Sequence, residues 1–132
     1  MERRMKIIVG GRASGKTTKL IQESAETGCR ILTHNKKSAS EIYWQAKDLG
    51  YDIPTPLSVM NLQRIDLYPE TKTEIKKQGI LIDDLETTLS ALCSCTIHSV
   101  SFCCADTPLI TIDSQGNMKM FYKGENGGGN RE

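Results

Sequence analysis

The chain has 132 residues, of which 25% are charged and 38% are hydrophobic, and its formal net charge at pH 7 is +1. These values are typical of a soluble globular protein, and the length fits one domain with its own core. No apolar run approaches the roughly 20 residues that a membrane-spanning helix needs, and the apolar stretch near the N-terminus is too short for a signal peptide. We therefore expect a cytoplasmic protein with no membrane partner.

Charge is distributed unevenly along the chain. Residues 1–50 contain ten Lys or Arg and five Asp or Glu, whereas residues 51–132 contain seven and eleven. A positive N-terminal half favours an anionic ligand there, although solvated helix faces account for part of the excess.

Residues 5–17 have the pattern of a strand followed by a phosphate-binding loop. Residues 5–9, MKIIV, are a short apolar run suited to a buried parallel strand. Residues 10–17, GGRASGKT, match the pattern G-x-x-x-x-G-K-[ST]. The glycines let the backbone curl so that successive N–H groups point at phosphate oxygens, and the helix that follows adds its positive end. The residues expected to bind nucleotide are Gly10, Gly11, Arg12, Ala13, Ser14, Gly15, Lys16, Thr17 and Thr18.

Two side chains of this loop have expected roles toward ATP and Mg²⁺. Lys16 places a cation beside the β- and γ-phosphates, where it is a candidate catalytic residue, and the Thr17 hydroxyl is a candidate Mg²⁺ ligand. A helix is predicted over residues 16–27, because this stretch lacks Pro and Gly, and Gly28 is placed to end it.

Residues 29–34 are predicted to form a second strand that ends in polar side chains. The S-x-x-E pattern of Ser38 and Glu41 is a capping box, which predicts the start of a helix. Tyr43 and Trp44 lie outside the apolar stripe of that helix, so we expect them to be half exposed and packed under a loop rather than stacked on a base. The stripe consists of Ala39, Ile42, Ala46 and Leu49.

Residues 51–79 are expected to be surface structure. Within this segment, the two prolines of residues 53–56 predict a rigid connector. A short strand is predicted over residues 57–60, and one or two helical turns are predicted from Thr71.

Residues 79–86, GILIDDLE, indicate an apolar strand that ends in acidic residues. Asp83 falls at the C-terminal end of this strand, where open α/β sheets place ligand groups, so its carboxylate is expected to hold Mg²⁺ together with Thr17. Asp84 is a candidate catalytic residue that positions or polarises the attacking water. A compatible alternative makes Asp84 the N-cap of a helix, because Leu85, Leu89 and Leu92 follow it at helical spacing.

The last third of the chain predicts one more buried strand and a hairpin. Residues 97–104 are suited to the interior of the sheet. The polar residues that follow form either a turn before Pro108 or a sensor of the γ-phosphate. Residues 109–112 and 118–122 predict a strand pair joined by a turn. Residues 124–132 are expected to be a flexible tail, so the expected domain covers residues 1–123.

The five cysteines lack the spacing of a zinc site, because no C-x-x-C pair occurs. In a reducing compartment disulfides are not expected, and free cysteines act as small buried apolar residues. These residues are Cys29, Cys93, Cys95, Cys103 and Cys104.

With the loop, the acidic strand and the strands between them, the chain resembles the RecA-like class of P-loop ATPases, which includes helicases and viral DNA-packaging motors. The sequence of residues 10–18, GGRASGKTT, is similar to the phosphate loop of the large terminases of tailed phages. Residues 31–39 are similar to a helicase segment in which Thr and Asn meet single-stranded DNA. The resemblance spans roughly residues 5–113. It implies an α/β fold, a single P-loop NTPase domain with a mostly parallel sheet flanked by helices, with residues 97–104 between the loop strand and the acidic strand.

The resemblance implies a slow Mg²⁺-dependent ATPase that is coupled to DNA or to an assembly partner, either further copies of the chain or a larger protein. Arg12 would then stabilise the transition state, as a basic residue in the terminase loop is proposed to do. Arg64 and an arginine from a neighbouring subunit are the other candidates for this role. The family usually carries Asp-Glu where this chain has Asp83-Asp84. The expected DNA contacts are Thr33, His34, Asn35, Lys36 and Lys37.

Two other functions fit the same residues. One is an ATP-dependent binding or regulatory module that does not hydrolyse the nucleotide. The other is a nucleoside or nucleotide kinase, because residues 15–21 resemble the loop and helix of thymidine-kinase-type enzymes, although the C-x-x-C zinc lid of those enzymes is absent from the sequence.

Overall fold

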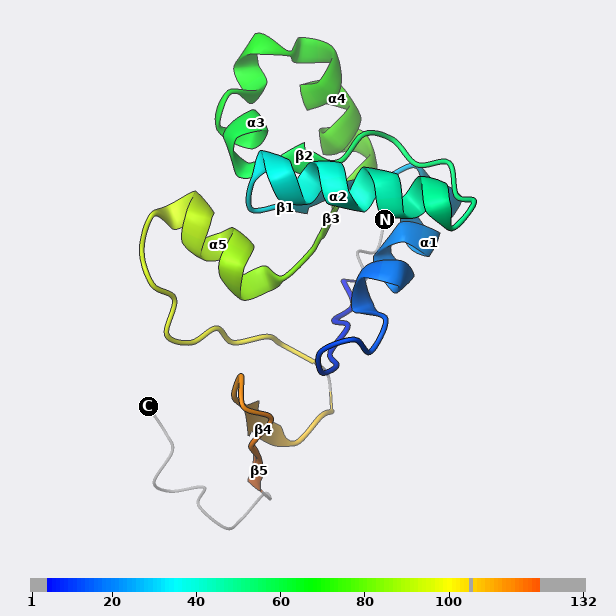
Figure 1. Cartoon of the computed structure of the whole chain (residues 1–132). Helices are drawn as coiled ribbons and strands as arrows, with labels where there is room; N and C mark the ends of the chain where they lie inside the picture. Colours follow the sequence, from blue (N-terminus) through cyan, green and yellow to red (C-terminus); the bar gives the residue numbers. More distant parts are fainter. Residues whose placement is uncertain (1–4, 105, 122–132) are drawn as a thin grey trace. The chain divides into compact units, whose positions relative to one another are not determined.

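A computed structural model of the chain describes residues 5–104 and 106–121 (Figure 1). The chain divides into two compact units, residues 1–98 and residues 99–132, which are described separately below. The predicted tail and the domain boundary at residue 123 lie outside the described residues. Among the helices that are described, none has the length and apolar character required to cross a membrane.

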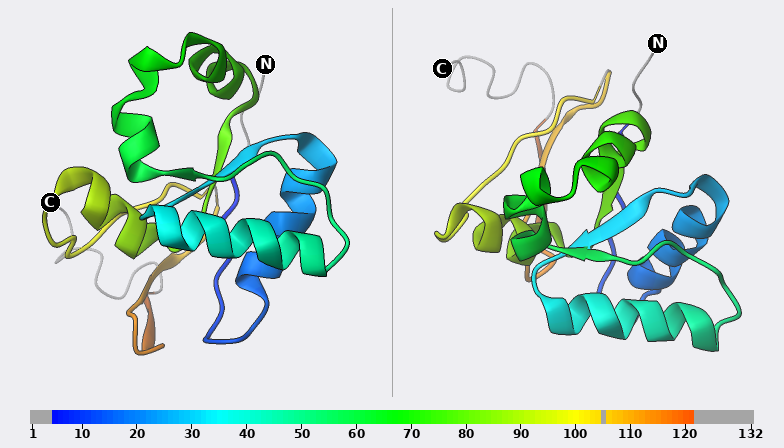
Figure 2. Two further views of the ribbon diagram at one scale, coloured as in Figure 1. Left: turned by 45° about the horizontal axis from the view of Figure 1, so that its top comes forward. Right: turned by 90° about the horizontal axis from the view of Figure 1, so that it is seen from above.

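The first unit is a mixed α/β structure with a three-stranded parallel sheet. The strands are ordered β2-β1-β3, with β1 pairing with both neighbours. Helices α1 and α2 lie on one side of the strands, and α3 and α4 lie on the other (Figure 2). The predicted α/β class, with a parallel sheet flanked by helices, is confirmed. The elements are α1 (Lys16–Thr27), β1 (Arg30–Thr33), α2 (Lys36–Asp48), β2 (Leu57–Ser58), α3 (Val59–Gln63), the 3-10 helix η1 (Ile65–Leu67), α4 (Pro69–Gln78), β3 (Ile80–Ile82) and α5 (Leu85–Cys93).

The core of this unit lies between β1 and the two helices α1 and α2. Ile21, Ile31 and Ala46 are each 0% exposed and belong to one apolar cluster. The register pairs Ile31 with Leu81, which packs against the same cluster. Burying these side chains provides the main driving force for docking the helices. The further members of the cluster are Leu20, Ile42 and Ile53.

The start and end of α2 differ from the prediction. The Asn35 side chain accepts a hydrogen bond from Ser38 N at 2.8 Å, so Asn35 is the N-cap and the capping box predicted at Ser38 and Glu41 is wrong. Asn35 lies three residues before Ser38, which is the usual spacing between an N-cap side chain and the N–H group that it caps. The helix therefore begins at Lys36. Leu49, the last member of the predicted stripe, is the C-cap of α2 and is 47% exposed, so the buried part of the stripe ends at Ala46.

Residues 5–9 and 97–104 form no strand among the described residues, so both predicted strands are wrong. Ile8 packs against the core, but Ile7 and Val9 are 54% and 66% exposed. An apolar pattern indicates which side chains a segment can bury, whereas a strand also requires a neighbouring backbone with which to exchange hydrogen bonds. Neither segment has such a pairing within the described chain.

Residues 57–78 contain more helix than predicted. Ser58 and Asn61 form a reciprocal capping box, so the predicted strand stops at Ser58 and α3 begins at Val59. Helix α4 is ten residues long and starts with Pro69 at its first turn, where a missing N–H costs nothing. The helical turns were predicted only from Thr71.

The second unit contains an antiparallel pair, β4 (Leu109–Ile112) and β5 (Met118–Phe121), which confirms the predicted hairpin. The Asp113 carboxylate accepts hydrogen bonds from the backbone N–H groups of Gln115 and Asn117, both at 2.9 Å. These bonds, first among them those with Asn117, lower the pKa of Asp113 and close the turn.

The prediction that the cysteines are buried is wrong. Four of the five are exposed, and Cys29 is half-buried with its Sγ 3.2 Å from the Gln78 carbonyl oxygen. The exposed ones lie at the end of α5 or in residues without regular structure, where no apolar layer covers them. They are Cys93, Cys95, Cys103 and Cys104.

Arg30 ties the sheet to two surface segments, which generates a stability prediction. Its Nε and Nη2 donate to the Glu74 carboxylate at 2.9 and 3.2 Å, and its Nη1 donates to the Thr55 carbonyl oxygen at 3.0 Å. We expect Arg30→Ala to lower the free energy of unfolding by about 1–3 kcal/mol, because these bonds are charge-assisted and partly buried. Urea unfolding followed by circular dichroism measures the change.

The control is the ion pair between Lys6 and Glu23, in which Lys6 Nζ lies 3.0 Å from Glu23 Oε1. The Lys6 side chain is 65% exposed, so Lys6→Ala should change stability by less than about 1 kcal/mol. Equal effects of the two substitutions would contradict the structural role assigned to Arg30.

Candidate functional site

The loop of residues 10–17, called the glycine loop below, contains two residues in the left-handed backbone region. Ala13 and Gly15 have positive φ values of 59° and 93°, with an ordinary residue between them. Such alternation makes successive N–H groups converge on one side of the chain. Gly10 approaches Ser14 so closely that a Cβ at position 10 would lie 2.4 Å from Ser14 Oγ. A residue with a Cβ at position 10 therefore requires the Ser14 side chain to move.

Lys16 and Thr17 begin α1 directly after the loop. Lys16 Nζ donates to the Gly11 carbonyl oxygen and lies 3.4 Å from Ser14 Oγ, so its charge is held across the loop. Thr17 Oγ1 donates to Asp83 Oδ1 at 3.2 Å. This bond joins residues that are 66 positions apart in the sequence, and it brings together the two side chains that the sequence predicts as a pair.

Asp83 is held by both its backbone and its carboxylate. Its N–H donates to the Leu32 carbonyl oxygen of β1 at 2.9 Å, and its own carbonyl oxygen accepts from Thr88 Oγ1 at 2.6 Å. Burial raises the pKa of Asp83 above its ordinary value; the Thr17 hydroxyl opposes this shift and the neighbouring Asp84 charge adds to it. Thr88 is only 2% exposed, and sequence reasoning missed it. A threonine in the first turns of the helix after an acidic strand is the signal for such a bond.

Asp84 caps α5. It adopts a left-handed backbone, with φ 54°, and its carboxylate accepts from Thr87 N at 3.4 Å. The alternative predicted for Asp84, a helix N-cap, is confirmed. Its predicted catalytic role is a separate matter, which this capping bond does not test.

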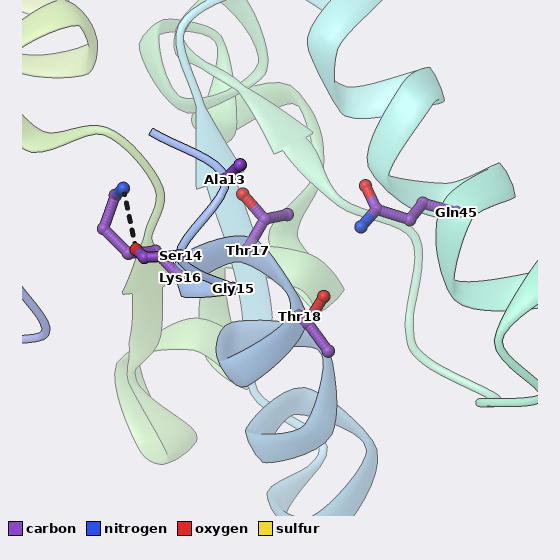
Figure 3. Close-up of a pocket in the computed structure, with 7 residues that line it drawn as sticks. All are labelled: Ala13, Ser14, Gly15, Lys16, Thr17, Thr18 and Gln45. Atoms are coloured by element: carbon purple, nitrogen blue, oxygen red, sulfur yellow. Dashed lines mark hydrogen bonds between the residues drawn. The ribbon is translucent and has the colours of Figure 1, made fainter. Parts of the chain in front are cut away.

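A hollow of about 330 Å³ lies over the glycine loop and the first turn of α1 (Figure 3). Gln45 reaches toward Thr18 from α2 and forms the far wall. Gln45 is a site residue that the sequence did not predict, because its helical position follows exposed Trp44 and carries no motif. Arg12 is exposed and stands outside the described residues that line the hollow. The lining residues are Ala13, Ser14, Gly15, Lys16, Thr17, Thr18 and Gln45.

The residues predicted to contact DNA differ in how far their side chains are exposed to solvent. Thr33 is 0% exposed, so it is not available as a surface contact, and the Asn35 side chain caps α2. Lys36 and Lys37 are exposed on the first turn of α2. The proposed contact surface is thereby reduced to these two lysines and the partly exposed His34.

The oxygen atoms at this site suit a hard divalent cation. Mg²⁺ is commonly held by one or two protein oxygens, with phosphates and water completing its shell, and the Thr17 hydroxyl and the Asp83 carboxylate are such a set. Within the described residues no group of three or more His, Cys, Asp or Glu side chains is placed to hold a metal. A Mg²⁺ ion held by the Thr17–Asp83 pair would take its remaining ligands from phosphate and water.

Comparison of the chain with known protein families, curated proteins and solved structures gave no match.

The raised pKa of Asp83 leads to a pH prediction. A protonated Asp83 is favoured in the fold, so the stability that this proton contributes is present below the ordinary pKa of 3.8 and is lost as pH rises through the folded pKa. Asp83→Asn has no charge to bury and can still accept from Thr17. We expect it to match the wild type near pH 3 and to be more stable at pH 7.

Urea unfolding of both proteins between pH 3 and pH 7, without nucleotide or metal, measures this difference. Glu86→Gln, on an exposed position of α5, is the control and should show no such divergence. A stability difference that stays constant with pH would reject the burial of the Asp83 charge.

Proposed function

We propose that the chain binds ATP with Mg²⁺ at the glycine loop and hydrolyses it slowly, in a process coupled to DNA or to an assembly partner. The observation that carries the proposal is the hydrogen bond from Thr17 Oγ1 to Asp83 Oδ1. A loop with the phosphate-binding pattern and an acidic strand end are useful to a nucleotide only if they meet, and this bond joins them.

Each part of the site has a role in this function. The converging N–H groups of the glycine loop and the N-terminus of α1 bind phosphate oxygens. Lys16 exchanges its bond to the Gly11 carbonyl oxygen for the β- and γ-phosphates. Thr17 and Asp83 hold Mg²⁺, which neutralises phosphate charge when it is bound. The hollow extends from the loop to Gln45 and leaves room for the rest of the nucleotide.

Hydrolysis requires a residue that orients the attacking water. Asp84 is the proposed residue, because it directly follows Asp83 at the carboxyl end of the sheet. Arg12 is the proposed transition-state cation, and it would have to turn inward from its exposed position on the loop. An arginine from a second copy of the chain, or from a partner, is the alternative source of that charge.

A second function, ATP binding without hydrolysis, is favoured by one observation. The Asp84 carboxylate accepts from Thr87 N and is one methylene shorter than the glutamate usual at this position in the family it resembles. A carboxylate engaged as a cap is less available to water. Nucleoside or nucleotide phosphorylation remains the third candidate function.

Binding is tested by thermal unfolding with and without ATP–Mg²⁺. A ligand present at 100 times its Kd adds about 2.7 kcal/mol to the stability of the native state, so the midpoint should rise by several degrees. Lys16→Ala should abolish the rise, because it removes the cation aimed at the phosphates. Lys19→Ala, on an exposed position of the same helix, should retain it. A wild-type midpoint that does not move at millimolar ATP–Mg²⁺ would reject the proposed binding site.

Hydrolysis is tested by phosphate release from Asp84→Asn. Asparagine caps a helix as well as aspartate does, so this variant should fold and bind ATP but lose most of its turnover. Glu86→Gln should retain the wild-type rate. Equal turnover by Asp84→Asn and the wild type would remove Asp84 from the mechanism.

The same assay separates the coupled processes. Turnover per chain should rise with protein concentration if a second copy completes the site. Alternatively it should rise with added DNA, an effect that fades as salt increases. Stimulation by a nucleoside, with phosphate transferred to it, would instead identify a kinase. A rate at the buffer background in every arm would favour the binding module.

A further inference from the structure

Two buried polar atoms lack a partner at one place in the first unit. Within the part of the chain that the structure describes, the buried side-chain atoms with no hydrogen-bond partner are Thr33 Oγ1 and His34 Nδ1. The two residues are consecutive, and they stand where β1 ends. Buried polar groups are nearly always paired, because an unpaired one loses its water without any replacement.

The strand register places Thr33 beside Asp83. Leu32 of β1 pairs with Ile82 of β3, and the Asp83 N–H donates to the Leu32 carbonyl oxygen, so the next position along β1 adjoins Asp83. Residues paired across parallel strands direct their side chains to the same face of the sheet. Thr33 and Asp83 are therefore neighbours on one face.

That face is the one covered by α1. Ile31, two residues before Thr33, and Leu81, two residues before Asp83, both pack with the cluster that contains Leu20 and Ile21 of α1. Because side chains alternate along a strand, Thr33 lies on the same side as Ile31. Asp83 bonds to Thr17 at the start of α1, so the three hydroxyl and carboxylate groups share one side of the sheet at its carboxyl end.

We propose that Thr33 is a positioning residue of the nucleotide site, and that its hydroxyl binds a water molecule in the hydration shell of the Mg²⁺ held by Thr17 and Asp83. This inference rests on the proposed function. The Thr33 side chain is 0% exposed, so its unpaired hydroxyl destabilises the unliganded chain. Magnesium keeps several of its waters in protein sites, and such a water is the partner that the fold itself does not supply.

Thr33→Val and Thr33→Ser test the proposal as a matched pair. Valine has the shape of threonine without the hydroxyl, whereas serine keeps the hydroxyl and loses a methyl group. The valine variant should unfold without ligand at the wild-type midpoint or at about 4 °C above it, because it removes an unpaired buried hydroxyl. It should bind ATP–Mg²⁺ up to about tenfold more weakly, through loss of one hydrogen bond to a magnesium-bound water molecule. The serine variant should be less stable and bind within about twofold to threefold of the wild type.

The measurements are thermal unfolding and titration calorimetry with ATP–Mg²⁺, ADP–Mg²⁺ and ATP in EDTA. The weaker binding of Thr33→Val, relative to the wild type, should appear with both magnesium nucleotides and should vanish in EDTA. A defect confined to ATP–Mg²⁺ would move the hydroxyl to the γ-phosphate and overturn the assignment to the metal shell. A valine variant that is less stable and binds normally would make Thr33 purely structural.

Failure of the inference is distinguishable from failure of the proposed function. If the wild type itself shows no binding of ATP–Mg²⁺, the nucleotide site is wrong and Thr33 has no role in it. If the wild type binds and the valine variant binds equally well, the site stands and only the role of Thr33 is rejected.

Discussion

The hydrogen bond between Thr17 and Asp83 joins two parts of the chain that neither local sequence nor local structure would bring together. Thr17 begins α1 and Asp83 follows β3, 66 residues later. For the two to meet, β3 must pair with β1, and α1 must pack on the β1 face through Ile21 and Ile31. The apolar core and the strand ladder therefore set the geometry of the site, and the glycine loop is positioned by the helix that follows it.

Within the described residues, the buried side-chain atoms that lack a hydrogen-bond partner lie at this end of the sheet. Burial raises the pKa of Asp83, and the hydroxyl of Thr33 lacks a partner beside it. Both features disfavour the unliganded fold, and both would be relieved by a cation and its water molecules. Strain and unsatisfied groups that a packed domain would otherwise avoid tend to collect at binding sites. The proposed function accounts for these two departures with one ligand.

Side-chain contacts of β1 and α5 help to hold the strand end that carries Asp83. Arg30 connects β1 to Glu74 of α4 and to the backbone at Thr55, through three hydrogen bonds. Thr88 of α5 holds the Asp83 carbonyl oxygen. The segment that carried the weakest sequence signals, residues 51–79, thus helps to fix the strand on which the candidate metal ligand depends.

The sequence by itself determined the features that depend on a few adjacent residues. The glycine loop, the helix ending at Gly28, the acidic strand end and the hairpin of residues 109–121 each follow from local backbone preferences, which the residues impose directly. Only the tertiary structure decided that residues 5–9 and 97–104 form no strand, that Thr33 is buried without a partner, and that Gln45 faces the loop. Strand pairing, burial and the walls of a hollow are properties of segments distant in the sequence, and a pattern within one segment does not contain its partner.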